Sequence, residues 1–571
     1  MKHYIKKVKE KKEMKRQVLQ KLLSCSLAAA LILGTLAGCG SNGDAGQVAS
    51  QSQQATGSAA AEPGQENAEP SQEAAAGITY PIDTDVTLTV VVVPDPTKST
   101  SIFEDLQDSP WYQQLQERTG IKLEIQYAAD TKAQELLLMS GDLPDMVWGA
   151  YAMLPGGAEV CIEDGIILPL NDYLNDYMPD YKALMEGNIE YRKIATTASG
   201  DIWGGICAGE TYEMKQGGGV MVRQDWLDDL GMEAPRTAEQ FYDMLVAFKE
   251  EKGAEVPFST TLNNLKAYFL HHAITDAFGL VSTSFYHMDG EIHYGYAEAE
   301  VKQVFEFVHK LYVDGLLDPE FATLDAATEK SNILTGRSGC THLLVGSVNG
   351  YRDSQENENY WLCGLSPMVQ NEGDVARGGY GAGLSGNQAF VITTACEHPE
   401  IAAALLNYGY SEEGQLFYNF GEEGVCWKYD AEGQPAFTDL IMNNPDGWSY
   451  AQACATYTHG NYQGPHIQME RYYQQALSVD EHRLKAWERL AVTDWEKYCV
   501  SDGVQIPTEL QDEYAKIESE VTTYIDEMIV AYITGAKSLD NFESEYMATL
   551  QSLKVDRMIE IKQIAYDEYR K

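Results

Sequence analysis

Few residues of this 571-residue chain have the types and spacing of a catalytic or cofactor motif. Gly381-Ala382-Gly383-Leu384-Ser385-Gly386 matches GxGxxG, but a strand is expected after it and not the helix that a dinucleotide-binding loop requires. His271-His272, His287 and His293 do not share a ligand spacing on one element, and there is no P-loop, HExxH or GxSxG motif. We therefore expect no catalytic residue, no cofactor and no metal, although 86 acidic residues leave a glycosidase-like carboxylate pair open.

The most specific chemistry is that of Cys39. A basic segment, Met1–Arg16, precedes the apolar run Leu22–Leu36, which is shorter than the roughly 20 residues that span a bilayer. This order predicts a secretory signal peptide over 1–38. Leu36-Ala37-Gly38-Cys39 resembles a bacterial lipobox, which implies that the Cys39 thiol takes a diacylglycerol and that Cys39 becomes the mature N-terminus. The alternative is a secreted protein with a chance cysteine at this position.

The composition is that of an acidic globular protein. With 41 basic and 86 acidic side chains the formal net charge is −45, which argues against nucleic-acid binding because that function needs a basic surface. The same charge repels anionic lipids, so membrane attachment would come from the anchor. Eight of the ten cysteines follow Cys39 without zinc-type spacing, and both disulfides and free buried thiols stay open for them.

Residues 39–77 predict a disordered linker, because they are rich in Gly, Ser, Gln, Ala and Glu and almost free of large apolar side chains. Ordered structure is expected from 78 on. Strands at Val86–Val93, Ile121–Ile125 and Met146–Trp148 alternate with two helices, one capped by Ser109 and ended by Gly120, the other running from Thr131 to Gly141. This alternation predicts parallel strands joined by right-handed crossovers.

Further along, Thr237 and Gln240 form a predicted capping box, and Asp289-Gly290 predicts a two-residue hairpin turn. Met221-Val222 leads into a helix, and strands are expected at Leu343–Val345 and Gln388–Thr394. Further helices are expected at Val301–Leu316, Thr508–Ile533 and Asn541–Arg570, the last with Asp540 as its N-cap. More than 450 ordered residues exceed one hydrophobic core, so two lobes are expected.

A set of short motifs then resembles a known family over most of the chain. The motifs are Tyr80–Thr89, Thr119–Ile121, Ser140–Asp145, Arg223–Leu227 with Leu230-Gly231, Leu311–Asp318, Glu423-Gly424 and Gln563–Tyr569. In this order they resemble extracellular solute-binding protein family 1, in its large-lipoprotein branch of Gram-positive bacteria. The resemblance implies an α/β, two-lobed periplasmic-binding-protein-like (type II) fold with hinge strands and a mostly helical C-terminal region. We expect 78–203 and 333–394 in the first lobe, and 204–332 and 395–571 in the second.

The same resemblance implies a function. The chain would be a monomeric receptor, lipid-anchored at the extracellular face of the cell membrane, that binds a small-molecule ligand between its lobes and delivers it to the permease subunits of an ABC transporter. Its 35 tyrosines favour an oligosaccharide, since aromatic rings offer sugars a flat apolar face beside a polar group. The alternatives are a surface-anchored glycoside hydrolase and a peptide-binding or sensor protein of the same fold.

Several aromatic residues and one arginine are the expected ligand contacts, each with packing in the cleft wall as the alternative. Trp148 and Tyr151 follow a strand at its carboxyl end, where open α/β sheets bind ligands. Trp203 and Tyr212 lie where the first crossover between lobes is expected.

The remaining candidates lie further along the chain. Arg223 offers a guanidinium to ligand hydroxyls or a carboxylate, whereas the adjacent Asp225 is expected to cap a helix. Tyr380 lies in the glycine-rich run Arg377–Gly386, and Trp427 follows the turn Glu423-Gly424.

Overall fold

The computed structural model describes residues 78–93, 103, 105–149, 154–212, 214, 217–357, 359–380, 385–459, 464–501 and 503–571, with the side chains of 385–389 left out. Cys39, the predicted signal peptide, the predicted linker and Tyr151 lie outside the described residues. None of the helices in these ranges combines the length and the apolar character that a membrane crossing requires.

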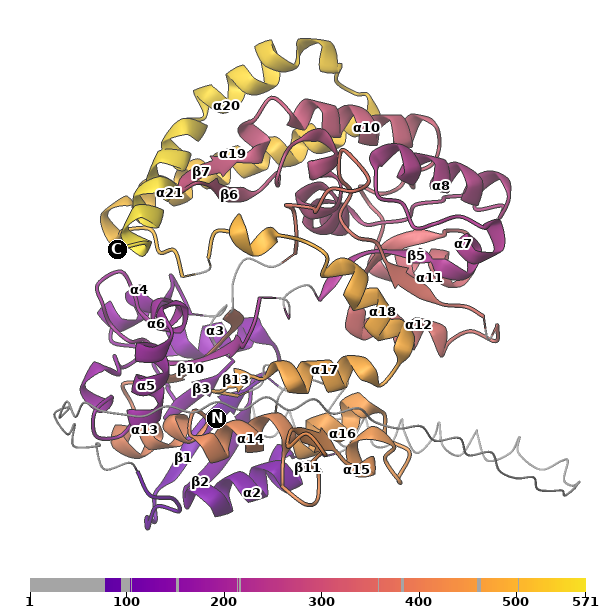
Figure 1. Ribbon diagram of the computed structural model, residues 1–571. Coiled ribbons are helices and arrows are strands. Elements are labelled where there is room, and N and C mark those ends of the chain that lie inside the picture. Colours follow the sequence, from indigo (N-terminus) through magenta and orange to yellow (C-terminus); the bar gives the residue numbers. More distant parts are fainter. Residues whose placement is uncertain are drawn as a thin grey trace, which may run out of the picture. The chain divides into compact units, whose positions relative to one another are not determined.

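A six-stranded sheet in the order β13-β4-β10-β3-β1-β2 organises the first lobe (Figure 1). Its strands are β1 (Thr87–Val92), β2 (Lys122–Tyr127), β3 (Met146–Trp148), β4 (Gly205–Gly209), β10 (Ser385–Ile392) and β13 (Ile467–Gln468). β1 pairs in parallel with β2 and β3, which confirms the predicted crossover connections. β10 runs antiparallel to β3 and β4, and β13 runs parallel to β4.

Local sequence signals explain the first two helices of this lobe, α2 (Pro110–Thr119) and α3 (Thr131–Ser140). The Ser109 hydroxyl accepts a hydrogen bond from the Tyr112 N–H and Pro110 takes the first helical position, as predicted. Gly120 ends α2 at φ 75°, and a Cβ there would lie 2.2 Å from the Ile82 carbonyl oxygen, so only glycine fits.

Further helices and a hairpin complete the first lobe. They are α4 (Ala158–Glu163), α5 (Pro179–Gly187), α6 (Ile189–Ala195), α13 (Pro399–Tyr408), α14 (Glu412–Phe420), α15 (Asp439–Met442), α16 (Tyr450–Tyr457), β11 (Trp427–Tyr429) and β12 (Pro435–Phe437). After β13, α17 (Glu470–Ser478) and α18 (Glu481–Leu490) lead into the second lobe, where Leu477 and Leu490 share a core with Met221.

The second lobe contains a three-stranded sheet, β8-β5-β9, and a separate hairpin. Its strands are β5 (Gly218–Arg223), β6 (Phe285–Met288), β7 (Glu291–Tyr294), β8 (Cys340–Leu344) and β9 (Leu362–Gly364). The turn between β6 and β7 is Asp289-Gly290, with φ values of 52° and 92°, as the sequence predicted. The capping box of Thr237 and Gln240 is also confirmed.

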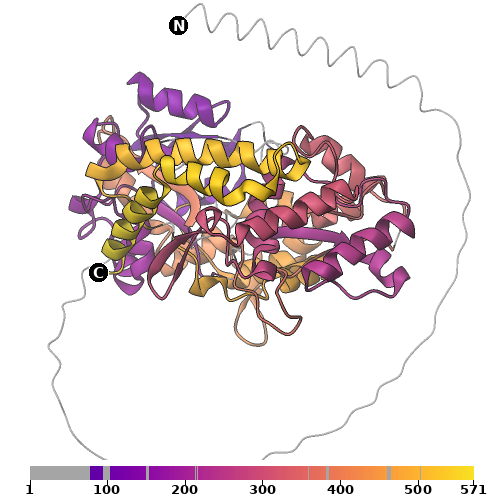
Figure 2. The same cartoon turned by 90° about the horizontal axis from the view of Figure 1, so that it is seen from above.

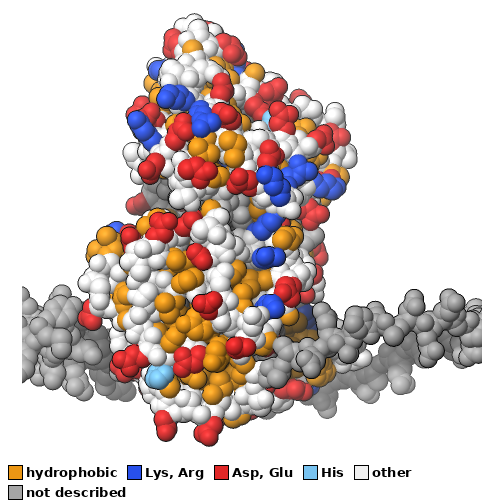
Figure 3. All heavy atoms as spheres, turned by 90° about the vertical axis from the view of Figure 1, so that its left-hand side faces the viewer, with side chains coloured by type: hydrophobic (Ala, Val, Ile, Leu, Met, Phe, Trp, Pro, Cys, Tyr) orange, Lys and Arg blue, Asp and Glu red, His pale blue; other side chains and the backbone are white. Residues whose placement is uncertain are grey.

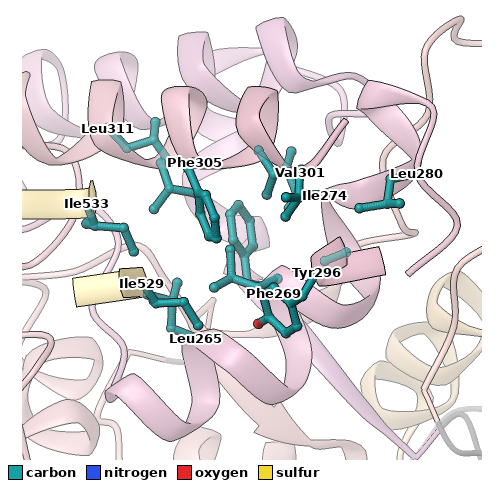
Figure 4. Packing of buried hydrophobic residues seen from close by; sticks show 14 of the residues in the cluster. Leu265, Phe269, Ile274, Leu280, Tyr296, Val301, Phe305, Leu311, Ile529 and Ile533 are labelled. Carbon is teal, nitrogen blue, oxygen red and sulfur yellow. The ribbon is translucent and has the colours of Figure 1, made fainter. Parts of the chain in front are cut away.

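The helices of the second lobe surround a large apolar core (Figure 4). They are α7 (Gln224–Leu230), α8 (Ala238–Glu250), α9 (Leu262–Asn264), the π-helix η6 (Leu265–Ala273), α10 (Val301–Val313), α11 (Ala326–Leu334), α12 (Val348–Arg352), α19 (Thr508–Thr534), α20 (Ala548–Ser552) and α21 (Val555–Tyr569). α19 packs against α21 (Figure 2) and against α10, where Phe305 and Ile529 meet in the core. The eight cysteines within the described residues are all buried.

The structure divides the chain between lobes at other points than predicted. β4 is still a strand of the first-lobe sheet, and β8 and β9 pair with β5 in the second lobe. Pro399–Phe420 contributes Leu405 and Phe417 to the core of the first lobe, although the prediction assigned it to the second. The chain therefore crosses between lobes after β4, before β10 and after β13.

The predicted single helix Asn541–Arg570 is also wrong. Lys554 adopts φ 65°, a left-handed conformation that interrupts the helix and separates α20 from α21. Before α20 the chain forms a short turn whose N-cap is Ser538 and not Asp540.

Candidate functional site

The three crossovers leave the first lobe at one edge of its sheet. Ser385, at the start of β10, and Ile467, in β13, both pair with Ala208 near the end of β4. The carboxyl end of β3 points towards this edge but stops short of it, because Trp148 pairs with Phe390, which also pairs with Gly205 at the start of β4. Open α/β sheets bind ligands outside the carboxyl ends of their strands, so this edge is the candidate ligand-binding side of the first lobe.

A pocket in the second lobe lies beside these crossovers. Its lining consists of Gly218, Gly219, Val220, Tyr268, His272, Ala273, Leu365, Pro367, Gly379, Tyr380 and Leu490. Gly218 follows the first crossover, Tyr380 precedes the second, and Leu490 ends the helix pair that follows the third. The pocket therefore lies in the second lobe, and part of its wall comes from residues near the segments that connect the lobes.

A π-helix positions two of the aromatic side chains. Tyr268 and His272 lie on η6, where the N–H of Ile274 donates to the Phe269 carbonyl oxygen five residues earlier, at 3.2 Å. Such wide turns cost helix stability and often occur at functional sites. Here the wide turn directs Tyr268 and His272 into the same pocket.

The aromatic rings form a stack along the pocket wall. Tyr268 stacks on Tyr380, with centroids 4.9 Å apart and planes at 28°, and its ring also stacks on that of His342 at 5.7 Å. His272 meets Tyr380 edge-on at 6.0 Å. Stacked rings with polar groups at their rims can hold an apolar ring face and bond its hydroxyls, which is what a sugar requires.

Two glycines keep this pocket open. A Cβ on Gly218 would lie 3.0 Å from Tyr268 Cε1, and one on Gly219 would lie 2.5 Å from Leu490 Cδ2. Side chains at these positions would push Tyr268 or Leu490 into the pocket. The glycine run that opens β5 therefore has a steric role at the site.

The histidines beside the stack are uncharged at neutral pH. Burial lowers the pKa of His342 to about 3, and its Nδ1 lies 2.8 Å from the Thr260 hydroxyl. Burial, and then the neighbouring His271, hold the pKa of His272 well below its ordinary value. Burial, and then the Tyr380 hydroxyl, raise the pKa of Tyr268, so this phenol stays protonated.

Of the predicted contact residues that the structure describes, Tyr380 alone lines this pocket. Tyr212 lies in the first crossover and packs against the cores of both lobes. Trp148 is the last residue of β3 and is 4% exposed, packed between Tyr112 and Phe390. Its buried Nε1 has no hydrogen-bond partner in the described part of the chain, so Trp148 and Tyr212 stay predictions.

The structure places Trp203 and Trp427 outside the described pocket. Trp203 lies two residues before β4 and is 2% exposed, with its Nε1–H donating to the Ile194 carbonyl oxygen. Trp427 is equally buried, and its Nε1–H donates to the Gly421 carbonyl oxygen. Both indoles are buried core residues that do not line the described pocket, and their contact with a ligand stays a prediction.

Arg223 is also displaced from the site. It lies four residues beyond Gly219 along β5, which at the usual rise is about 13 Å. Its guanidinium makes a bidentate ion pair with Asp225, at 2.7 and 2.5 Å, and lies between the rings of Trp226 and Tyr360. Arg223 and Asp225 therefore stabilise the β5–α7 junction, and neither lines the pocket.

Sequence reasoning missed Tyr268, His272 and the glycine pair. His271-His272 was considered only as a metal pair, and a tyrosine four residues before His272 gave no further signal. The run Gly217-Gly218-Gly219 before a predicted strand was the one available cue, since glycine there often marks a close approach of another group.

Two α/β lobes joined by three crossovers, with a pocket in the second lobe beside those crossovers, define the two-lobed class of solute-binding proteins. The chain belongs to the family described as bacterial extracellular solute-binding protein, whose profile matches residues 95–416.

Curated relatives bind several glycans. The fructooligosaccharide ABC transporter substrate-binding protein FusA of Streptococcus pneumoniae is 23% identical over 521 residues, covering 86% of this chain and 92% of the relative. The polygalacturonan/rhamnogalacturonan-binding protein YtcQ of Bacillus subtilis is 22% identical over 346 residues, covering 57% and 67%.

Solved structures share the fold. The alginate-binding protein AlgQ2 superimposes with a TM-score of 0.63 at 21% identity, covering 86% of this chain and 99% of that one. An HMO-binding, ABC-transporter-associated solute-binding protein from Bifidobacterium longum infantis gives a TM-score of 0.65 at 17% identity, covering 85% and 99%.

The burial of His342 predicts a pH-dependent stability. Its pKa is lower in the folded than in the unfolded chain, so its contribution is complete above about pH 6.5 and is lost as the pH falls towards 3, by about 1.4 kcal/mol per pH unit. We expect His342→Gln to lower stability at pH 7 but to flatten the pH dependence between 6.5 and 4.5, measured by urea unfolding. His398→Gln, at a half-exposed side chain, is the control. If the free energy of unfolding has the same slope against pH in wild type and His342→Gln, the low pKa assigned to His342 is contradicted.

Proposed function

We propose that this chain is a lipid-anchored extracellular solute-binding protein that captures an oligosaccharide between its two lobes and delivers it, as a monomer, to the permease of an ABC transporter. The observation that carries the proposal is the stack of Tyr268 and Tyr380 in a pocket beside the crossover segments. The glycan-binding relatives support a carbohydrate ligand.

The crossovers supply the conformational part of this function. Two lobes joined by a few strands at one sheet edge can close about those strands and enclose a ligand at the junction. Closure would create a surface that the open form lacks, so a permease could distinguish the loaded from the empty receptor. An anchor at Cys39 would keep the receptor beside that permease.

A surface glycoside hydrolase is the competing hypothesis. Glycosidic cleavage commonly uses two carboxyl groups about 5–10 Å apart. The residues that line the described pocket include no aspartate or glutamate, which supports binding over hydrolysis at this position. A peptide-binding or sensor protein would share the fold and differ in its ligand or partner.

A thermal-shift screen of the chain from residue 78 on, against glycan oligomers, monosaccharides and peptides, tests the proposal. A ligand at a hundredfold excess over its Kd should stabilise the protein by about 2.7 kcal/mol. We expect a saturable shift from an intact oligosaccharide, checked by product analysis. A shift from peptides alone would replace the ligand class, and a cleaved glycan would favour the hydrolase.

Replacing Tyr380 should weaken the binding of the best oligosaccharide from that screen. Tyr380→Ala removes one ring of the stack with Tyr268, and we expect Kd to rise at least tenfold by isothermal titration calorimetry. Tyr177→Ala, at a 37% exposed tyrosine of the first lobe, is the matched control and should leave Kd unchanged. An unaltered Kd in Tyr380→Ala would remove this pocket from the proposed site.

The lipid anchor can be tested in a Gram-positive host that expresses the full chain. If the Cys39 thiol carries the lipid, Cys39→Ala should move the protein from the membrane fraction to the culture medium. Cys161→Ala, at a buried cysteine of the folded domain, should leave it in the membrane fraction. Equal membrane retention of Cys39→Ala and wild type would refute lipid attachment at this residue.

A further inference from the structure

We propose that the pocket selects uncharged sugars and rejects glycans with a carboxylate in the bound unit. This inference rests on the proposed function and deepens it by naming the ligand class. The relatives leave the question open, because their names include a neutral fructooligosaccharide as well as polygalacturonan and alginate, which are polymers of uronic acids.

The first argument is the chemistry of the lining. It consists of glycine, alanine, valine, leucine, proline, tyrosine and histidine, so no lining residue of the described pocket carries a fixed charge. Burial keeps His272, and His342 beside Tyr268, neutral, so these imidazoles supply no positive charge at neutral pH. Hydroxyl and imidazole groups can bond sugar hydroxyls, but they cannot neutralise a carboxylate.

The second argument is that two arginines that lie near lining residues in the sequence already have partners. Arg377, two residues before Gly379, bonds the Asp276 carboxylate through Nε at 2.9 Å and through its backbone N–H at 2.8 Å, and its Nη2 donates to the Gly279 carbonyl oxygen. Arg489, next to Leu490, donates from Nη1 to Gln224 Oε1 at 2.7 Å. Recruiting either guanidinium to a ligand would break these contacts.

The third argument is the negative charge around the pocket. Glu329 is 4% exposed, and its charge adds to burial and to Tyr380 in raising the pKa of Tyr268. Its carboxylate accepts hydrogen bonds from Asn264 at 2.9 Å and Thr341 at 3.2 Å. Acidic side chains are scattered over both lobes on the face shown in Figure 3, consistent with the net charge of −45. This field opposes the approach of an anion.

These observations set the cost of an acidic ligand. A carboxylate moved from water into a closed pocket without a cation loses several kcal/mol of hydration free energy. A neutral sugar of the same shape loses only hydroxyl hydration, which the pocket can replace with hydrogen bonds. We therefore expect a discrimination of at least a hundredfold in Kd.

The experiment measures binding to the full exported chain by isothermal titration calorimetry. The probes are matched panels of neutral oligosaccharides and oligouronates, followed by the best neutral ligand with one primary hydroxyl oxidised to a carboxylate. We expect the tightest ligands to be neutral and the oxidised derivative to bind at least a hundredfold more weakly. An oligouronate that binds as tightly as the best neutral sugar would overturn the inference and leave the proposed function intact. Binding by neither panel would overturn both.

Repeating the titrations at 0.05 and 0.5 M NaCl separates the pocket from the net charge of the protein. Long-range repulsion is screened within about 3–4 Å at the higher salt concentration, whereas the cost of an unpaired carboxylate inside the pocket persists. Discrimination that survives at 0.5 M NaCl supports selection by the pocket. If neutral and carboxylate-bearing ligands bind equally tightly at 0.5 M NaCl, selection by the pocket is overturned.

Discussion

The arrangement of the molecule depends on one constraint: three crossovers leave a single sheet edge from three neighbouring strands, β4, β10 and β13. Because these strands are hydrogen-bonded to one another, their ends stay together and the segments beyond them must enter the second lobe at one place. Gly218, Tyr380 and Leu490 lie on those segments, which is why residues far apart in the sequence share one pocket. In the proposed function, closure of the lobes about these segments would enclose a ligand beside this pocket.

Within this pocket, burial determines the chemistry. The same desolvation that stabilises neutral imidazole at His272 and His342 makes the wall a neutral aromatic surface. The π-helix η6 brings Tyr268 and His272 to this wall, and Gly218 and Gly219 leave the space in front of it. Arg377 bonds the Asp276 carboxylate, and Arg489 donates to the Gln224 side chain. The site thus presents an uncharged aromatic wall beside the segments that connect the lobes.

Local signals predicted much of the first lobe and several elements of the second, because caps and turns act over a few residues: Ser109 and Gly120 bound α2, and Asp289-Gly290 forms the hairpin. The division between lobes failed because it depends on which distant strands pair, and β8 and β9 pair with β5. Residue type suggested Trp203 and Arg223 as ligand contacts. In the structure the buried Trp203 indole donates to the Ile194 carbonyl oxygen, and the Arg223 guanidinium pairs with Asp225. The glycine-rich surroundings suggested Tyr380, which lines the described pocket, and its contact with a ligand stays a prediction. No periodic pattern marks a π-helix, so the sequence did not suggest Tyr268 and His272.

The most direct test of the central claim is a crystal structure of the protein with its tightest oligosaccharide ligand. The account predicts a sugar ring against the Tyr268 and Tyr380 side chains, with both lobes contacting the ligand and the first lobe doing so from the sheet edge at which the crossovers leave. A ligand bound elsewhere, with this pocket empty, would contradict the account.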